Sequence, residues 1–325
     1  MQHCIRRATW LSFVACVLPW AAASDLAYAQ RDRADSEATA PIEAWPVRDN
    51  VYVLFGASGN ITVSIGPSGI LLVGTGLEDQ SAAVGAALER LDRKLSVSGA
   101  PKRPLRYIVN TSVHPEYTGG NAALRSLQAE AASVIAHEKV LIRLVDQNAP
   151  FAQLPTTTFG DGEHNLAAPF NGENIRLIHM PAATTDGDAI VHFRGADVIS
   201  TGALISMNAY PPIDIARGGS INGLIEALNT ILKIAIPGVG GDGGTLIVPG
   251  HGRLADSADV GAYRDMLTII RDHVQYLIDS GMTLDQIQTA RPTLGYDRRF
   301  GSAAEPETIE AFVEAVYRSL AAAPR

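Results

Sequence analysis

The sequence contains very little cysteine. Among its 325 residues only Cys4 and Cys16 carry a thiol, and both lie in an N-terminal segment that we expect to be removed. A mature chain without cysteine has no disulfide and offers no thiolate ligand to a metal ion. Any metal site in this protein would therefore have to use other side chains.

Charged residues are also scarce. They make up 18% of the chain, and acidic residues outnumber basic ones, so the net charge is −8. An acidic surface disfavours binding to nucleic acid, whose phosphates attract Lys and Arg. Because 46% of the residues are hydrophobic, the chain can bury a large core, and we expect disorder only near its ends. No apolar run beyond the N-terminal segment is long enough to cross a bilayer.

The first 29 residues have the pattern of a secretory signal peptide. Arg6 and Arg7 precede an apolar run at residues 10–18, and an Ala-Tyr-Ala sequence at 27–29 matches a small-x-small cleavage pattern. We therefore predict cleavage before Gln30 and a periplasmic or secreted location. Sec export is favoured, and the two arginines leave twin-arginine export as the alternative.

The remaining chain is predicted to fold as one domain, 45–325, after a flexible lead-in at 30–44. Residues 61–65 alternate as a half-buried strand does, a turn follows, and 70–73 form a buried strand; residues 188–202 repeat this arrangement. Further strands are expected at 50–55, 105–109, 133–136, 175–179 and 245–248, and helices at 81–91, 121–127, 138–145, 223–232, 260–278, 283–289 and 306–320. The pattern predicts an α/β (α+β) architecture, with two β-sheets packed face to face and helices outside.

Two segments have no clear period. Residues 148–162 are rich in Pro, Thr and Gly, and we expect a long loop there. Residues 238–244 (G-V-G-G-D-G-G) resemble a phosphate-binding loop but lack its Lys-Ser/Thr, so we interpret them as a turn.

The polar loop at residues 110–120 is the centre of the predicted site. It leaves a buried strand and enters a helix, which is where open α/β sheets place their chemistry. Its polar side chains are Ser112, His114, Glu116 and Tyr117. Residues 180–188, 200–203 and 247–252 also follow predicted strands, so we expect all four segments to meet at one cleft, the default place for a binding site.

The order and spacing of these segments resemble the metallo-β-lactamase superfamily from about residue 45 to residue 320. The landmarks are N-I-T-V-S-I-G at 60–66, N-T-x-x-H-x-x-x-T-G-G-N at 110–121, T-D-G-D at 185–188 and P-G-H-G at 249–252. The resemblance implies an αββα sandwich of two mixed sheets flanked by helices. It also implies a hydrolytic metal site between the edges of the sheets.

Only part of that metal site is present in this sequence. The resemblance places His114 and His251 at two of seven ligand positions, and Glu116 at a third that is aspartate in the family. The other four ligand positions hold Ser112, Tyr117, Thr184 and Ala203. In addition, Gly74 replaces an aspartate that usually follows the first buried strand. A catalytic zinc needs about three protein ligands and an open position. We therefore expect no cofactor, or zinc that binds only weakly.

The favoured function is a catalytically degenerate hydrolase homologue, a pseudoenzyme that binds a small molecule in the former metal cleft. The cleft is predicted to be lined by Ser112, His114, Glu116, Tyr117, Thr184, Asp188 and His251. One alternative is a hydrolase with one metal ion held by His114, Glu116 and His251. Another is a metal-free hydrolase, with Ser112 or Tyr117 as nucleophile and His114 as base. A third is a partner-binding protein whose cleft is inert.

The remaining polar candidates receive structural interpretations. Asp186 and Asp188 are expected to form hydrogen bonds within their turn. Five further histidines show no spacing typical of metal ligands, and we interpret them as structural or surface residues: His137, His164, His179, His192 and His273.

Overall fold

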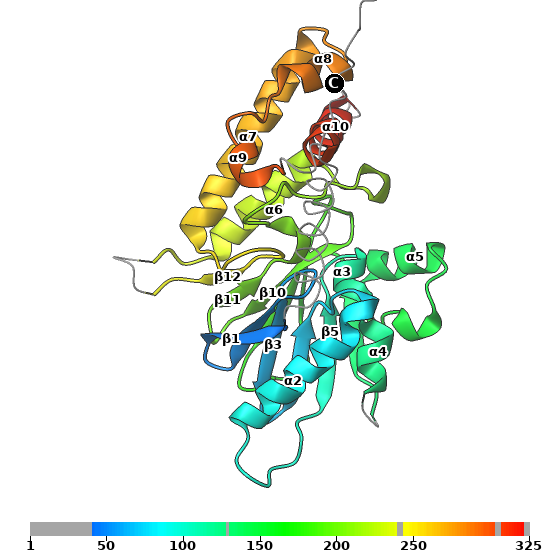
Figure 1. Ribbon diagram of the computed structural model, residues 1–325, viewed down its shortest axis with the longest axis vertical. Helices are drawn as coiled ribbons and strands as arrows, with labels where there is room; N and C mark the ends of the chain where they lie inside the picture. The colour runs from blue at the N-terminus through cyan, green and yellow to red at the C-terminus, as the bar shows by residue number, and fades with distance from the viewer. Residues whose placement is uncertain (1–40, 128–129, 239–242, 303–306, 322–325) are drawn as a thin grey trace, which may run out of the picture. The chain divides into compact units, whose positions relative to one another are not determined.

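Figure 1 shows the computed structural model, which describes residues 41–127, 130–238, 243–302 and 307–321. The chain divides into two units, Met1–Pro41 and Ile42–Arg325, and the second is described below. The predicted signal peptide and most of the predicted lead-in lie outside the described residues, as does the middle of the glycine-rich segment 238–244. The first strand begins at Glu43, inside the span that the sequence pattern assigns to the lead-in.

The first sheet has seven strands in sequence order. They are β1 (Glu43–Arg48), β2 (Val51–Phe55), β3 (Ile61–Gly66), β4 (Gly69–Val73), β5 (Leu105–Asn110), β6 (Ser133–His137) and β7 (Thr157–Phe159). Strands β1 to β4 form an antiparallel meander, whereas β4 to β7 are parallel. Parallel neighbours need crossover connections, and the helices α2 (Ser81–Leu95), α4 (Asn121–Ser126) and α5 (Glu138–Asp146) lie in them.

The second sheet has five strands in the order β12-β11-β10-β9-β8. They are β8 (Glu163–Asn165), β9 (Ile175–Met180), β10 (Asp188–Phe193), β11 (Val198–Ser200) and β12 (Leu246–Val248). Strands β8 to β11 are antiparallel, and β12 is parallel to β11. Both sheets are therefore mixed, and in both the parallel strands end on polar loops.

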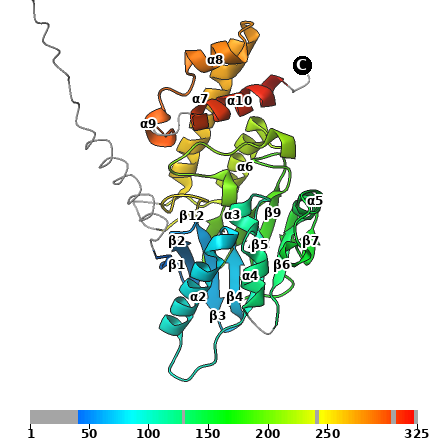
Figure 2. The same cartoon turned by 45° about the vertical axis from the view of Figure 1, so that its right-hand side comes forward.

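Helices cover the outer face of each sheet (Figures 1 and 2). Apolar side chains of α2 and α4, such as Val84 and Leu124, pack on the first sheet. The second sheet is covered by α6 (Ile221–Ile234), and α7 (Ser257–Asp279) and α10 (Glu307–Ala321) pack against α6. A third apolar cluster, which includes Leu71 and Leu177, fills the space between the sheets. The observed architecture is the αββα sandwich that the sequence predicts.

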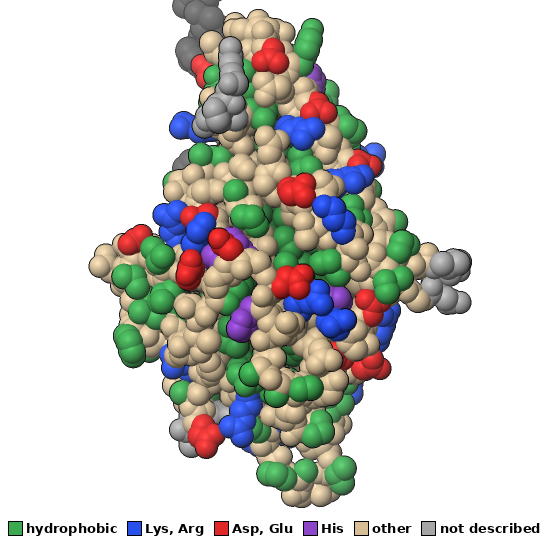
Figure 3. Space-filling model, turned by 180° about the vertical axis from the view of Figure 1, so that it is seen from behind, with side chains coloured by type: hydrophobic (Ala, Val, Ile, Leu, Met, Phe, Trp, Pro, Cys, Tyr) green, Lys and Arg blue, Asp and Glu red, His purple; other side chains and the backbone are tan. Residues whose placement is uncertain are grey.

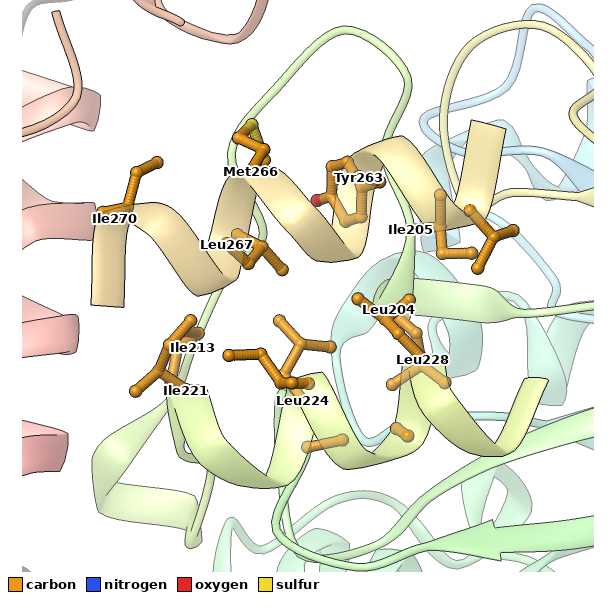
Figure 4. Close-up of a cluster of buried hydrophobic side chains, with 14 of the residues drawn as sticks. Leu204, Ile205, Ile213, Ile221, Leu224, Leu228, Tyr263, Met266, Leu267 and Ile270 are labelled. Atoms are coloured by element: carbon orange, nitrogen blue, oxygen red, sulfur yellow. The ribbon is translucent and has the colours of Figure 1, made fainter. Parts of the chain in front are cut away.

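The packing between α6 and α7 is shown in Figure 4, where Leu224 and Leu228 of α6 face Tyr263 and Leu267 of α7. Helix α7 begins with a reciprocal capping box, because Asp256 accepts from the Asp259 backbone while the Asp259 side chain accepts from the Asp256 N–H. Two shorter helices, α8 (Leu284–Ala290) and α9 (Asp297–Phe300), connect α7 to α10. No helix among the described residues is long and apolar enough to span a membrane.

One side chain connects the two sheets at the end where β3 turns into β4. Asn171 lies between β8 and β9, and its Nδ2 donates to Ser64 Oγ and to the Gly69 carbonyl, both at 3.1 Å. Its Oδ1 accepts from the Ser68 N–H at 2.8 Å. Its own carbonyl accepts from Asn50 Nδ2 at 2.9 Å.

The interpretation of residues 148–162 as one long loop was wrong. This segment contains β7, which pairs with β6 and forms the edge of the first sheet. The strand is only three residues long and two of them are exposed, so its sequence lacks the apolar alternation by which a strand is recognised. The three-residue strand β8 was missed for the same reason.

Candidate functional site

The central loop follows β5 and contains the short helix α3 (Pro115–Thr118), which lies at the end of that strand (Figure 2). His114 is the N-cap of α3 and has an extended backbone, and a proline occupies the first helical turn, where its fixed φ favours helix initiation. The two ends of the loop are joined by paired amides. Asn121 Nδ2 donates to Asn110 Oδ1 at 2.8 Å, and Asn110 Nδ2 donates to the Tyr117 carbonyl at 2.6 Å.

The ends of β11 and β12 meet at this loop, which itself follows β5, as the sequence predicts. A Cβ built on Gly250 would overlap the Tyr117 hydroxyl and the Gly202 carbonyl, and one built on Gly202 would overlap the Thr111 side chain. The P-G-H-G turn and the end of β11 therefore come into direct contact with the central loop. Gly250 has to be glycine here because another backbone and a buried side chain approach it closely.

Glu116 and His251, two of the predicted site residues, contact each other. His251 Nε2 lies 3.1 Å from Glu116 Oε2, and the two side chains are 35% and 21% exposed. Both groups are thus reachable from solvent, and each has the other as a partner. The structure brings together Glu116, Tyr117 and His251 from two loops that are far apart in the sequence.

Tyr117 lies beneath this pair and is 2% exposed. Burial raises the pKa of its phenol well above the usual value of 10.0, and the nearby negative charges of Glu116 and Asp188 add to the effect. A phenol in this environment stays protonated at neutral pH. Its ring lies against Gly74, whose Cβ would be 3.5 Å from Cδ1 of the ring.

Four buried polar atoms of the loop have no hydrogen-bond partner among the described residues: Thr111 Oγ1, Ser112 Oγ, His114 Nε2 and the Tyr117 hydroxyl. Buried polar groups in folded proteins are nearly always paired with protein or water. Four such atoms within seven residues of one loop therefore indicate a place where water or a ligand completes the hydrogen bonding.

Thr184 and Asp188 belong to a self-contained turn next to this loop. Asp188 accepts four hydrogen bonds, from the backbone N–H and the hydroxyl of both Thr184 and Thr185, at 2.5–2.8 Å. Asp188 is 1% exposed and Thr184 is fully buried. Asp188 thus forms the hydrogen bonds within the turn that the sequence predicts, and the hydroxyl of Thr184 is already used. Ala203, at another of the family's ligand positions, is 4% exposed and apolar.

In the described part of the chain, one group of three side chains has ligand atoms within 4.8 Å of one another, and it lies outside the central loop. It consists of His137, Asp161 and His179. The sequence interpretation of His137 and His179 as residues without a ligand pattern therefore needs correction. His137 ends β6 in the first sheet, whereas His179 lies on β9 in the second. Their proximity arises from the packing of the sheets and has no short sequence motif.

A hollow of about 500 Å³ adjoins the loop of His251. Its lining combines apolar and aromatic side chains, such as Met207, Tyr263 and Phe300, with the charged side chains of Asp259, Arg298 and Arg299. Met207 connects the hollow to the site, because its N–H donates to the His251 carbonyl at 3.0 Å.

With this geometry established, the fold can be compared with solved structures. The metallo-β-lactamase from Pontibacter korlensis superposes with a TM-score of 0.54 and 16% identity, over 70% of this chain and 99% of that one. DIM-1 metallo-β-lactamase gives 0.55 and 16%, over 70% and 98% of the two chains. The sec-alkylsulfatase Pisa1 from Pseudomonas sp. gives 0.64 and 16%, over 87% of this chain and 51% of that one.

The chain thus has the metallo-β-lactamase fold, as its sequence landmarks predict. It spans nearly the whole length of the two β-lactamases but only about half the length of the alkylsulfatase. No protein-family model matches the sequence, and no match to a curated protein was found. Structural similarity at 16% sequence identity shows the fold alone, so the site has to be interpreted from its own residues.

Proposed function

We propose that this protein is a catalytically degenerate member of the metallo-β-lactamase fold that binds an uncharged small molecule at the central loop. The observation that carries the proposal is the set of four buried polar atoms without partners, on Thr111, Ser112, His114 and Tyr117. The hydroxyls of Ser112 and Tyr117 are buried, so a ligand reaches them only when side chains of the loop move aside. A ligand with carbonyl or hydroxyl oxygens can then accept from both of these hydroxyls. The negative charges of Glu116 and Asp188 close to Tyr117 disfavour an anionic group at the same place.

The geometry supports binding over a metal-dependent hydrolase. A single metal would need three ligand atoms around one point with an open position. Among the described residues, His114, Glu116 and His251 do not form such a group. Glu116 and His251 contact each other instead.

The geometry also gives little support to a metal-free nucleophile. A serine nucleophile needs a base within hydrogen-bond reach, but Ser112 Oγ has no partner among the described residues. The raised pKa of Tyr117 makes its phenolate scarce at neutral pH. For a partner-binding protein we would expect an extended apolar or single-sign patch. The face in Figure 3 has acidic and basic side chains interspersed.

Ligand-observed NMR with a set of neutral lactones, amides and sugars tests the proposal. The wild type should bind at least one of these compounds, and the double variant Ser112→Ala/Tyr117→Phe should bind it about tenfold more weakly or worse, because two hydrogen bonds are lost. His164→Asn, on β8, is the matched control and should bind like the wild type.

Two results would overturn the proposal. The first is the absence of any binding, or equal binding by the double variant, which would leave the central loop without a ligand. The second is zinc that survives dialysis of the wild type at one ion per chain and is lost in His251→Ala. That result would promote the one-metal hydrolase.

We further propose that the mature protein begins near Gln30 and is exported, on the basis of the signal pattern at residues 1–29. Intact-mass measurement of protein from the native cell envelope should give a chain that starts at or near this residue. A cytoplasmic species that retains Met1 would contradict export.

A further inference from the structure

The cluster of His137, Asp161 and His179 is separate from the central-loop residues and is formed by both sheets. His137 Nε2 lies 3.4 Å, and His179 Nδ1 3.1 Å, from Asp161 Oδ1. The two histidine side chains are almost fully buried, whereas that of Asp161 is 82% exposed. The cluster thus has a buried imidazole side and a carboxylate side that faces solvent.

The hydrogen bonding of His179 fixes which of its nitrogens is free. Its Nε2 lies 2.9 Å from the Asp186 carbonyl, which can only accept, so Nε2 carries the proton. In the neutral ring Nδ1 then presents a lone pair to the carboxylate of Asp161. Two acceptors 3.1 Å apart repel each other unless a proton or a cation lies between them. A ring nitrogen backed by a carbonyl in this way is typical of histidines that bind metal ions.

From this arrangement we propose that His137, Asp161 and His179 bind one divalent transition-metal ion, with zinc as the best fit. Imidazole nitrogen and carboxylate oxygen are ordinary zinc ligands, and three of them leave a coordination position for water. The exposure of Asp161 places that position toward solvent. The site would link the first sheet, through His137, to the second, through His179.

Metal binding requires one movement, because the histidine rings are packed closely and His137 also lies edge-on against Phe159. The two imidazole rings are stacked, with centroids 3.7 Å apart and planes 7° apart, so an ion shared by both would lie outside the ring planes. One ring therefore has to tilt. His137 is less firmly held, because its Nδ1 accepts only a long 3.4 Å contact from the Lys139 N–H and its Nε2 has no hydrogen-bond partner among the described residues.

Asp161 can follow this movement. It lies in the turn between β7 and β8, between Gly160 and Gly162, and neither glycine has atoms within 4 Å of an added Cβ. The turn is fastened to β9 by the Gly162 carbonyl, which accepts from the His179 N–H at 2.9 Å. The backbone of the turn thus stays near the histidines, while the exposed side chain of Asp161 is free to reorient.

Zinc titration by calorimetry tests the site on the full mature chain after dialysis against chelator. We expect the wild type to bind one zinc ion. Asp161→Asn should weaken binding by more than the about 10–100-fold that loss of an outer-shell partner costs, because a direct ligand is lost. Since Asp161 is exposed, this variant should fold normally. Cobalt gives a second measurement, because its visible absorption should change between wild type and Asp161→Asn.

Two matched controls separate this site from the central loop. His164→Asn removes a nearby histidine that stacks on Phe159, and it should leave zinc affinity unchanged. Glu116→Gln/His251→Asn removes the carboxylate–imidazole pair of the central loop and should also leave it unchanged. Small-molecule binding at the central loop, conversely, should persist in Asp161→Asn, so the failure of one proposal is distinguishable from the failure of the other.

The inference is overturned if the wild type takes up no zinc, in which case the cluster holds only a proton. It is also overturned if Asp161→Asn binds zinc as tightly as the wild type does. If zinc binding is lost only in the Glu116→Gln/His251→Asn variant, the ion belongs to the central loop, and both proposals fail.

Discussion

The central loop and the His137–Asp161–His179 cluster differ in where their polar residues come from. In the central loop, Ser112 to Tyr117 are close in the sequence, and Glu116 is already paired with His251. In the cluster, the three residues come from both sheets and one turn, and their ligand atoms gather around one point. Closeness along the chain therefore marks where a site of this fold lies, whereas the possible chemistry depends on which atoms converge in space.

The strongest test of this comparison is to rebuild the family's ligand set in the central loop. The variant combines Ser112→His, Glu116→Asp, Tyr117→His, Thr184→His and Ala203→Asp. If the loop backbone still suits metal, calorimetry should show about two additional zinc ions per chain, as in two-metal sites of this type. Single changes should add none, because each leaves both coordination shells open.

Circular dichroism has to confirm that the rebuilt variant is folded, because Thr184 and Ala203 are buried. A folded variant without additional zinc would mean that the loop has been reshaped for another purpose. The two regions would then differ fully in metal binding, since only the cluster between the sheets could hold an ion.

The next effect in size concerns the turn beside the central loop. Asp188→Ala leaves four buried donors of Thr184 and Thr185 without an acceptor. Each such group costs about 1–3 kcal/mol, so we expect the free energy of unfolding to fall by at least about 3 kcal/mol in urea denaturation. Asp161→Ala, on the exposed carboxylate of the cluster, is the contrasting variant and should change it by less than about 0.5 kcal/mol without metal. Equal losses would contradict the assignment of Asp188 as a scaffold residue.

A smaller loss is expected for the Glu116–His251 pair of the central loop. Glu116→Gln removes the carboxylate charge opposite His251, and both side chains are partly exposed. Pairs of this kind contribute about 0–1 kcal/mol, so denaturation should shift by no more than that and should become less sensitive to salt. A loss of several kcal/mol would mean that the pair is a structural element of the loop.

The smallest effect at neutral pH is expected for Tyr117→Phe. The hydroxyl has no partner among the described residues, so its removal should change stability by less than about 1 kcal/mol in either direction. At alkaline pH the two proteins should diverge. Because the folded-state pKa of Tyr117 is raised above 10.0, the unfolded state loses the proton first, and the wild type loses stability as pH rises above this value.

Urea denaturation of both proteins between neutral pH and about pH 11 measures this divergence. Tyr117→Phe cannot ionise at this position and should lose less stability over the same range. If the two stabilities fell in parallel with pH, the pKa of Tyr117 would not be raised in the folded protein, and the prediction would be wrong.

The sequence predicts the fold well where apolar patterns are long. Buried runs such as 70–73 and 105–109 become β4 and β5, and the amphipathic segment 81–91 becomes α2. Short elements without such a pattern, β7 and β8, were missed, because their pairing is decided by the neighbouring strands.

The candidate site was likewise predicted only in part. The landmarks place Glu116, Tyr117 and His251 together because all three follow strand ends or turns of the sandwich. The pairing of His251 with Glu116 and the burial of the Tyr117 hydroxyl depend on side-chain packing, which spacing does not encode. His137 and His179 have no motif, so only the face-to-face packing of the two sheets reveals them.

The position of Asn171 has a consequence for how the sandwich can move. Its side chain and carbonyl fasten the second sheet to Ser64, Ser68 and Gly69 of the first, at the end of β4 opposite the central loop. The opposite end is fastened as well, because the Asn60 N–H donates to the Gly250 carbonyl at 2.7 Å and the Ala189 N–H donates to the Thr111 carbonyl at 2.9 Å. With hydrogen bonds between the sheets at both ends, the sandwich is a stiff frame. We therefore expect a ligand at the central loop to be admitted by rotation of side chains and not by separation of the sheets.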